Sequence, residues 1–340
     1  MTNNSVAKKL NEGRGAMRIC VVGAGAIGSL FAGHLGRTSE VWILTRREEQ
    51  ARELEADGLR VSGKSEFITP VRATADSASL PVFDLAIVCT KATDLDEAMS
   101  HLAGLSPEAV IMTTQNGLGA EEIVRRHGSW PVISAVTFMS GTRHSDSHVE
   151  YELDAPTWLG PGEQGPLRDT AIAVADLLMD SGLQAQAMDD VRPAQWSKLI
   201  FNATVNSISA LTELPHDHHF REQEKLWGLG NLVRRLVDEG KQVAKGAGIA
   251  LYEDPWEMNL HAVSRGETAD GAYRHNPSML DDVLARRPTE VDFITGQLVQ
   301  AGIRHGVETP LHLALYQLVK AKESAWVPSA PSGREANVDS

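Results

Sequence analysis

The feature that most constrains the fold is a glycine triplet between an apolar run and a helical segment. Gly23, Gly25 and Gly28 form a G-x-G-x-x-G pattern in VVGAGAIGSLFAGHL, residues 21–35. The surrounding pattern predicts a strand, a helix and a second strand over 17–22, 26–37 and 40–44. In such a unit the glycines permit a tight turn, close approach of the backbone to a phosphate and close helix–strand packing. This context favours a dinucleotide-binding loop over a plain glycine-rich turn.

The rest of the first half repeats the alternation of strands and helices. Further strands are expected over 84–90, 109–115 and 131–139, and helices over 47–58 and 94–103. Near-continuous apolar strands separated by helices indicate a parallel sheet covered on both faces. After Val149 a short β segment is expected to close this part of the chain.

The second half has helical periodicity in nearly every segment. Helices are expected over 194–211, 221–248, 253–265, 278–286, 289–305 and 310–325. The predicted fold class is therefore an α/β N-terminal Rossmann-type domain followed by an all-α C-terminal domain. The corresponding division is a flexible leader (1–16), a Rossmann-type domain (17–190), a helical domain (191–327) and a disordered tail (328–340).

Composition argues against several classes of function. The chain has 340 residues and a formal net charge of −13, so it lacks the excess of Lys and Arg that non-specific nucleic-acid binding needs. No apolar run approaches the roughly 20 residues of a membrane helix. The polar first residues lack the apolar region of a signal peptide, which predicts a cytoplasmic protein with no membrane partner.

Other candidate reactive residues have simpler explanations. Cys20 and Cys89 end or interrupt apolar runs, which predicts buried thiols. The histidines of HDHHF (216–220) lack a metal-ligand pattern, so a polar turn and no metal site are expected there. Trp196 and Trp227 are expected to be packing residues.

The end of the second strand indicates the cofactor. Sites for NAD usually have Asp or Glu at this point to bind the ribose hydroxyls. This chain has Thr45, Arg46 and Arg47 there instead. A guanidinium can bind a 2′-phosphate in bidentate fashion, which favours NADP and points first to Arg46. The alternative is that these arginines are ordinary solvent-exposed residues at a helix start.

Two polar residues follow the next strand ends, where ligands collect in sheets of this kind. Lys91 occurs in CTKATD and Asn116 in TTQNGLG. We expect Lys91 to lie at the nicotinamide end of the site rather than to be surface decoration. Asn-Gly also suits a turn with positive φ, and the two interpretations of Asn116 are compatible.

A polar line is predicted along an otherwise apolar helix in the second half. Lys198, Asn202 and Asn206 are spaced i, i+4, i+8 in WSKLIFNATVNS, so they share one face. Asn is unfavourable inside a helix, so these residues need partners. The partners are either a buried hydrogen-bond network or a bound ligand, and we favour a site.

Ser278 and Glu290 begin later segments. Ser278 follows Asn276-Pro277 and is suited to bind a carboxylate together with adjacent backbone amides, or to act only as an N-cap. Glu290 follows Pro288-Thr289 in an expected first turn, where it would also be favourable to the helix dipole.

Taken together, these motifs resemble the ketopantoate reductase (2-dehydropantoate 2-reductase) family. The matching motifs are GAGAIG, CTKATD, QNG, WSKLIFNATVN and PSMLDDVLARRPTEVDFITG, and the resemblance covers residues 17 to 325. It implies a Rossmann-type domain and an all-helical domain with the active site in the cleft between them.

The resemblance also implies roles for individual residues. Lys198 matches the catalytic lysine that donates a proton to the carbonyl oxygen, and Glu290 matches the acid that helps to position substrate. Ser278 matches the serine that holds the substrate carboxylate, and Arg46 matches the arginine that selects NADP. The other implied substrate contacts are Asn116, Asn202 and Asn206. The other implied cofactor contacts are Gly23, Gly25, Ala26, Ile27, Gly28, Lys91 and Asn116.

The chemistry expected from these residues is reduction of a 2-keto acid by NADPH. The hydride goes to the keto carbon, and Lys198 as an ammonium acid neutralises the developing alkoxide. The first expected substrate is 2-dehydropantoate, which would be reduced to (R)-pantoate in pantothenate biosynthesis.

Other functions stay open at this point. The segment 252–276, with Trp256, His261, Tyr273 and His275, departs from the family and is expected to line the substrate end. A related 2-hydroxy acid dehydrogenase with a bulkier substrate is therefore one alternative. A non-catalytic NADP-binding sensor is another, which would have no need of Lys198 and Glu290. The helical domain would suit a homodimer.

Overall fold

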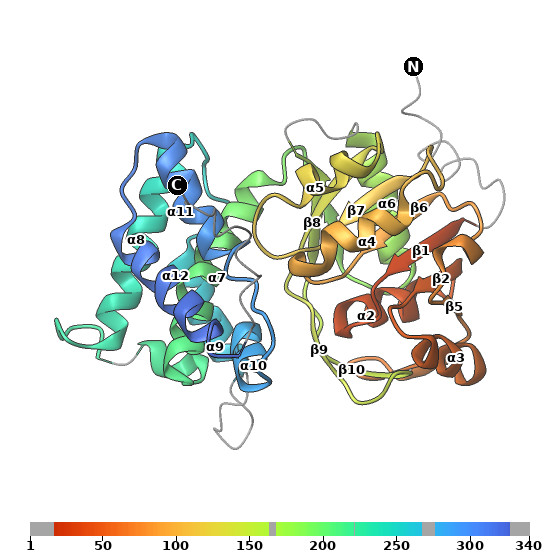
Figure 1. The fold of residues 1–340 in the computed structure, drawn as a ribbon, viewed down its shortest axis with the longest axis horizontal. Helices are drawn as coiled ribbons and strands as arrows, with labels where there is room; N and C mark the ends of the chain where they lie inside the picture. The colour runs from red at the N-terminus through yellow and green to blue at the C-terminus, as the bar shows by residue number, and fades with distance from the viewer. Residues whose placement is uncertain (1–16, 163–167, 221, 267–275, 327–340) are drawn as a thin grey trace, which may run out of the picture. The chain divides into compact units, whose positions relative to one another are not determined.

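The computed structural model describes residues 17–162, 168–220, 222–266 and 276–326 (Figure 1). The predicted leader and tail lie outside these residues. Contacts within the chain divide it into two units, Met1–Gln195 and Trp196–Ser340.

The N-terminal unit is built on an eight-stranded sheet. Its strands are β1 (Arg18–Val22), β2 (Glu40–Leu44), β5 (Arg72–Thr74), β6 (Leu85–Val88), β7 (Val110–Thr113), β8 (Val132–Thr137), β11 (Thr157–Pro161) and β12 (Ala185–Ala187). They lie in the order β12-β11-β8-β7-β6-β1-β2-β5. All neighbours pair in parallel except β11 and β8, which are antiparallel. The order from β5 to β8 is that of a doubly wound dinucleotide-binding sheet.

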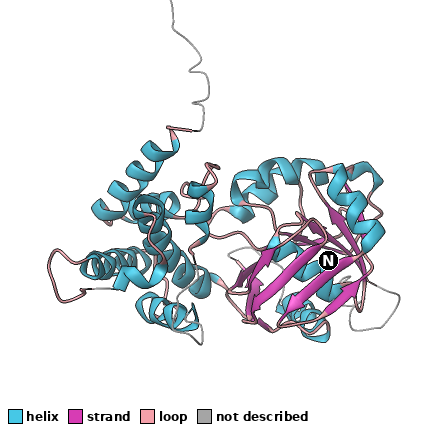
Figure 2. Cartoon of the chain, turned by 90° about the horizontal axis from the view of Figure 1, so that it is seen from below, coloured by secondary structure: helices cyan, strands magenta, loops and turns pink. Residues whose placement is uncertain are grey.

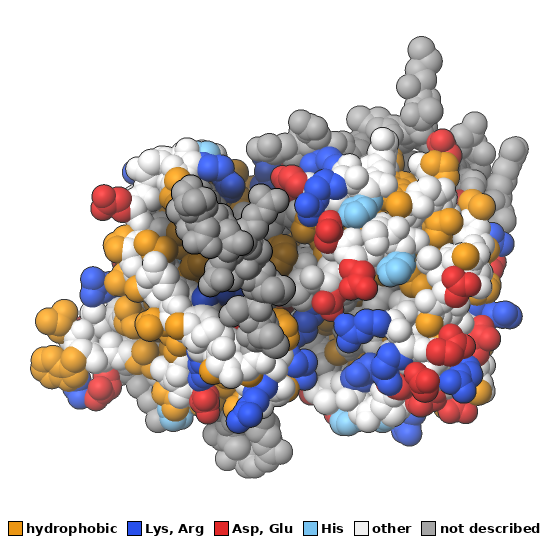
Figure 3. Space-filling model, in the orientation of Figure 1, with side chains coloured by type: hydrophobic (Ala, Val, Ile, Leu, Met, Phe, Trp, Pro, Cys, Tyr) orange, Lys and Arg blue, Asp and Glu red, His pale blue; other side chains and the backbone are white. Residues whose placement is uncertain are grey.

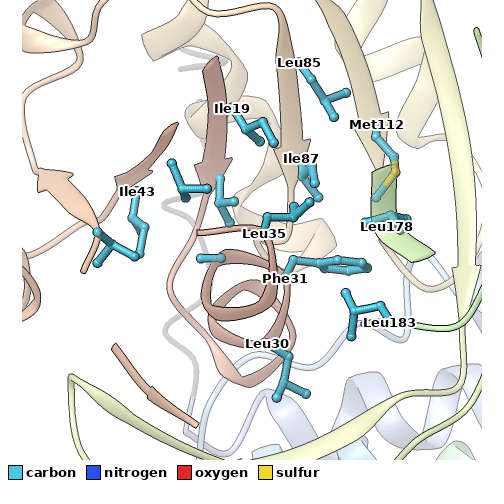
Figure 4. Packing of buried hydrophobic residues seen from close by; sticks show 14 of the residues in the cluster. Ile19, Leu30, Phe31, Leu35, Ile43, Leu85, Ile87, Met112, Leu178 and Leu183 are labelled. Carbon is cyan, nitrogen blue, oxygen red and sulfur yellow. The ribbon is translucent and has the colours of Figure 1, made fainter. Parts of the chain in front are cut away.

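Helices and apolar side chains surround this sheet. The helices of the unit are α2 (Ala26–Leu35), α3 (Glu48–Asp57), α4 (Leu95–Leu102), α5 (Ala120–His127) and α6 (Arg168–Asp180), with short 3₁₀ helices η1 (Ser77–Ser79) and η2 (Ala92–Asp94). Figure 4 shows Ile19 of β1 and Ile87 of β6 near Leu35 and Phe31 of α2, all fully buried. Because β6 and β7 are buried along their whole length, their sequences are continuous apolar runs.

A second, four-stranded sheet lies in the same unit. Its order is β4 (Phe67–Thr69), β3 (Leu59–Gly63), β10 (His148–Leu153) and β9 (Ser140–Arg143). β3 and β10 are parallel, and the two outer strands pair antiparallel to them. Of this sheet, the sequence predicts only the segment after Val149, because its strands are partly exposed and lack a continuous apolar run.

The second unit is helical throughout its described residues, as Figure 2 shows. Its elements are α7 (Arg192–Thr212), which begins just before the division, η3 (His216–Phe220), α8 (Leu229–Gly246), α9 (Pro255–Gly266), α10 (Ser278–Leu284), α11 (Thr295–His305) and α12 (Pro310–Glu323). Ile208 of α7, Leu236 of α8 and Trp256 of α9 belong to one buried cluster. The predicted fold class, α/β followed by all-α, is confirmed.

Several local predictions are wrong. The helix expected from 221 begins only at Leu229, and Trp227 is 82% exposed rather than packed, whereas Trp196 is buried as expected. The HDHHF segment is not a polar surface turn, because His216 and His219 are buried against aromatic rings. Among the described residues, no helix is both long enough and apolar enough to cross a membrane.

Candidate active site

The carboxyl ends of β1 and β6 mark the switch point of the large sheet. The chain leaves β1 toward β2 on one side, whereas β6 pairs with β7 on the other. Ligands bind outside the strand ends at such a point. The glycine loop follows β1, Lys91 follows β6 and Asn116 follows β7, so the structure brings these predicted residues to one edge of the sheet.

The glycine loop has the geometry that a pyrophosphate needs. Gly23 has a φ of +96°, which side chains rarely tolerate, and a Cβ at Gly28 would lie 1.9 Å from the carbonyl oxygen of Gly23. A Cβ at Gly25 would meet nothing within 4 Å, so the backbone there is open to a ligand. Gly25 is also the N-cap of α2 and makes no side-chain cap, which leaves the first-turn amides around Ala26 and Ile27 suited to an anion.

The loops after β6 and β7 are joined by a residue that the sequence analysis missed. The Gln115 side chain donates hydrogen bonds from Nε2 to the carbonyl oxygens of Val88 (3.0 Å) and Thr90 (2.9 Å). It therefore holds the loop of Asn116, which is partly buried, against the loop of Lys91, which is exposed. The position of Gln115, directly before Asn116 at a strand end, was the signal that could have identified it.

Arg46 lies at the strand end where it was predicted. Its side chain is 84% exposed, and its Nη1 lies 3.7 Å from Oδ2 of Asp94 in η2. The geometry is thus open to a phosphate and also fits the alternative of a solvated helix-start arginine. Arg47 is the N-cap of α3 and forms an ion pair with Asp146 instead.

In the helical unit, Lys198 and Glu290 interact. Burial disfavours the ammonium and lowers the pKa of Lys198 from 10.5 to about 8, whereas the charge of Glu290 opposes this shift. Glu290 itself is only 8% exposed. A lysine of this pKa can carry a proton at neutral pH and release it during a reaction.

The other two residues of the predicted polar line on α7 are buried. Asn202 and Asn206 are 7% and 2% exposed, so the helix presents amides inside the protein as the spacing predicted. Further along the same helix, the hydroxyl groups of Ser207 and Thr295 lie 2.7 Å apart. Thr295 is the first residue of α11, so the segment from Glu290 to Thr295 is connected to α7.

A network from α12 holds the residues on both sides of Glu290. The Thr289 amide donates to Oε1 of Glu323 (2.7 Å). Asp292 accepts hydrogen bonds from the Tyr316 hydroxyl (2.7 Å) and the Lys320 ammonium (2.9 Å). These α12 residues were missed, although their i, i+4, i+7 spacing marks one polar helix face.

The environment of Glu290 also corrects a helix boundary. The helix expected from residue 289 begins at Thr295, and Glu290 lies in the preceding turn. Glu290 is therefore not a first-turn acid at a helix dipole. Its burial and its proximity to Lys198 give it a different electrostatic role.

Ser278 is placed differently from the N-cap alternative. It is the exposed first residue of the seven-residue helix α10, whose N-cap is Pro277, and no side chain caps the helix. Its role toward a substrate carboxylate stays a prediction. In the segment 252–276, Trp256 packs in the helical core against Phe220, and Tyr273 and His275 lie outside the described residues.

Neither a cavity beside α8 nor the cysteines add reactive groups to this set. A cavity of about 600 Å³ at the end of α8 is lined by residues of α8 and by 248–254, which include the start of the segment expected at the substrate end, but by none of the individually predicted catalytic, substrate or cofactor residues. Burial raises the pKa of both Cys20 and Cys89 to about 12, so neither thiol ionises at neutral pH.

Comparisons with known proteins cover nearly the whole chain. The family model described as "Ketopantoate reductase PanE/ApbA" matches residues 19–164, and "Ketopantoate reductase PanE/ApbA C terminal" matches residues 190–323. The 2-dehydropantoate 2-reductase of Archaeoglobus fulgidus is 30% identical over 307 residues, which are 90% of this chain and 98% of the relative. That of Pyrococcus horikoshii is 27% identical over 308 residues, 91% of this chain and 98% of the relative.

Solved structures with the same fold include a ketopantoate reductase and a D-mandelate dehydrogenase. A PanE/ApbA family ketopantoate reductase from Ralstonia eutropha JMP134 has a TM-score of 0.79 and 26% identity, and the match covers 91% of this chain and 99% of that one. The ternary structure of D-mandelate dehydrogenase with NADH and anilino(oxo)acetate has a TM-score of 0.80 and 25% identity, with the same coverage.

Proposed function

The chain belongs to the ketopantoate reductase family, and from this premise we propose that it reduces a 2-keto acid with NADPH. The first substrate that we propose is 2-dehydropantoate, reduced to (R)-pantoate in cytoplasmic pantothenate biosynthesis. The observation that carries the proposal is the interaction of the partly buried Lys198 with the buried Glu290, in which the lysine has a pKa of about 8.

The residues of the chain would divide the work as follows. When bound, NADPH supplies the hydride that reduces the keto carbon. The open backbone at Gly25 and the uncapped start of α2 fit its pyrophosphate, and the exposed Arg46 would bind a 2′-phosphate.

Lys198 would provide the proton that completes the reaction. Its Nζ donates a proton to the carbonyl oxygen as that oxygen gains charge, which gives the 2-hydroxy acid and a neutral lysine. Water then returns the proton. The carboxylate of Glu290 keeps the ammonium populated at neutral pH by raising the lysine pKa. Asn202, Asn206, Asn116 and Ser278 would orient the substrate.

A second candidate function has an observation of its own. The likeness to D-mandelate dehydrogenase, which was solved with NADH and anilino(oxo)acetate, supports a bulkier aromatic 2-keto acid as substrate and NADH as cofactor. The same lysine chemistry would serve this substrate, so only the specificity differs.

The test is NADPH oxidation by the purified full chain, followed at the absorbance band of the reduced nicotinamide. The substrates are 2-dehydropantoate and benzoylformate, an aromatic 2-keto acid, each also assayed with NADH. We expect the highest kcat/KM with 2-dehydropantoate and NADPH. Faster turnover of benzoylformate would move the function to the second candidate. Tight NADPH binding with no turnover of either acid would favour a non-catalytic sensor.

A further inference from the structure

A hairpin far along the chain reaches the glycine loop of the N-terminal unit. Arg143, the last residue of β9, donates from Nη1 to the carbonyl oxygen of Ala24 (3.3 Å). Gln50 of α3 donates from Nε2 to the same oxygen (3.1 Å) and to the carbonyl oxygen of Asp146 (3.4 Å). The turn between β9 and β10 therefore lies beside both the glycine loop and the first turns of α3.

This turn carries a carboxylate shared by two arginines. Oδ1 of Asp146 forms an ion pair with Nη2 of Arg47, and Nη1 of Arg143 lies 3.6 Å from the same oxygen. The Asp146 side chain is 20% exposed, whereas the two arginines are 47% and 40% exposed. Figure 3 shows basic and acidic side chains intermingled over this part of the unit.

Other hydrogen bonds fix the turn in place. The Ser147 hydroxyl donates to Oε1 of Glu53 in α3 (2.7 Å), and the Arg60 amide of β3 donates to the Ser147 carbonyl (2.8 Å). The position of Asp146 is thus determined by the strands and helix around it, and not only by its exposed arginine partners.

The carboxylate of Asp146 lies where it can affect the preference between NADPH and NADH. The end of β2 is where dinucleotide-binding sheets usually have an Asp or Glu that binds the ribose hydroxyls. The sequence has Thr45, Arg46 and Arg47 there, but the fold brings in an aspartate from a hairpin about a hundred residues later. A negative charge next to a 2′-phosphate is unfavourable, and it also occupies arginines that the phosphate would bind.

We propose that Asp146 sets the preference between NADPH and NADH at this site, an inference that rests on the proposed function. Asp146 competes with the 2′-phosphate for Arg47 and Arg143, and it can accept a hydrogen bond from the ribose hydroxyl of NADH. It thereby limits the selectivity for NADPH that the arginines would otherwise give. Asp146 is a specificity-determining residue and takes no part in proton or hydride transfer.

The test measures the Kd of NADPH and of NADH for the full chain, by calorimetry without any keto acid, in the wild type and in Asp146→Asn. We expect the ratio of Kd for NADH to Kd for NADPH to rise about tenfold in the variant, mainly because NADPH binds more tightly. Glu152→Gln is the matched control. It removes one negative charge from β10 of the same hairpin, where Glu152 accepts a hydrogen bond from the Thr142 hydroxyl (2.7 Å).

An unchanged ratio in Asp146→Asn would overturn the inference, as would an equal rise in Glu152→Gln, which would indicate a general charge effect. Arg143→Gln provides a second test with the opposite sign, because the ratio should fall when a guanidinium is lost. An unchanged ratio in a folded Arg143→Gln protein would also count against the inference.

The failure of this inference and the failure of the proposed function are distinguishable. The binding assay contains no keto acid, so absence of turnover would contradict only the proposed function. If the wild type binds neither dinucleotide, both are overturned. If it binds them and the Asp146 variant leaves the ratio unchanged, only the inference about Asp146 is lost.

Discussion

In the N-terminal unit the candidate groups follow strand ends, whereas in the helical unit they come from segments far apart in the sequence. The glycine loop, Lys91 and Asn116 are each placed by the strand directly before them. Lys198 and Glu290 are 92 positions apart by numbering and meet only through the packing of α7 with the turn before α11. Strand order therefore determines the first group of residues, and tertiary packing determines the second.

The two units should differ in their sensitivity to single side-chain substitutions. Backbone atoms would provide most of the proposed nucleotide site, so single side-chain changes there should alter affinity by modest factors. The helical unit depends on one ammonium and one carboxylate held by a side-chain network, so single changes there should affect the chemical step more strongly.

The largest effect is expected from Lys198→Ala. We expect kcat to fall by about 10³-fold because the proton donor is lost, whereas the Kd of NADPH should change less than about twofold. The measurement is steady-state kinetics with calorimetric NADPH binding. Lys245→Ala, an exposed lysine of α8, is the control and should leave kcat unchanged. Near-normal turnover of Lys198→Ala would remove this lysine from the mechanism. Single changes in the helical unit would then no longer be expected to affect the chemical step more strongly than changes in the N-terminal unit.

A smaller effect is expected from Arg46→Ala in the N-terminal unit. Loss of the exposed guanidinium should raise the KM for NADPH about tenfold and leave the KM for NADH nearly unchanged, since only NADPH has the 2′-phosphate. Arg52→Ala is matched to it, because Arg52 is an exposed arginine of α3 that pairs with Glu48 and Glu49. Equal changes for both cofactors would contradict the 2′-phosphate assignment.

The same contrast explains which features could be predicted from the sequence. The central parallel strands are mostly buried, β6, β7 and β8 along their whole length, so their apolar runs identified them, and the fold class followed. The strands of the small sheet and β12 are partly exposed, which interrupts the apolar run and removes that signal. Local motifs could identify Lys198 and Glu290 as candidates, but no local pattern reveals that Glu323 binds the Thr289 amide or that Asp146 lies beside the glycine loop.

A third prediction concerns the network around Glu290. Glu323→Gln keeps an oxygen acceptor for the Thr289 amide but weakens that hydrogen bond and removes the ion pair with Lys320 (3.0 Å). We expect kcat to fall about fivefold with no change in NADPH affinity. The pH midpoint of kcat should also move lower, because a displaced Glu290 would raise the pKa of Lys198 less.

The control for this variant is Glu213→Gln. Glu213 forms an ion pair with Lys322, also on α12, at 2.9 Å, and its replacement should leave both kcat and its pH midpoint unchanged. If Glu323→Gln lowers thermal stability but leaves the pH midpoint at the wild-type value, its role is structural and it does not position Glu290.

The smallest effect is expected in the pH profile of Glu290→Gln. In the proposed mechanism Lys198 is an ammonium acid, so wild-type kcat should be highest below its pKa and fall as the pH rises through about 8. Glu290 raises that pKa, so replacing its carboxylate by an amide should move the midpoint to lower pH, by about half a unit. Glu308→Gln is the control, because Glu308 is an exposed carboxylate before α12 and its replacement should not move the midpoint.

A shift of the midpoint to higher pH in Glu290→Gln would reverse the sign of the interaction, and no shift would mean that Lys198 and Glu290 are not coupled during turnover. The midpoint is the decisive quantity here, because any loss of substrate positioning would change the amplitude of kcat and leave its pH dependence in place.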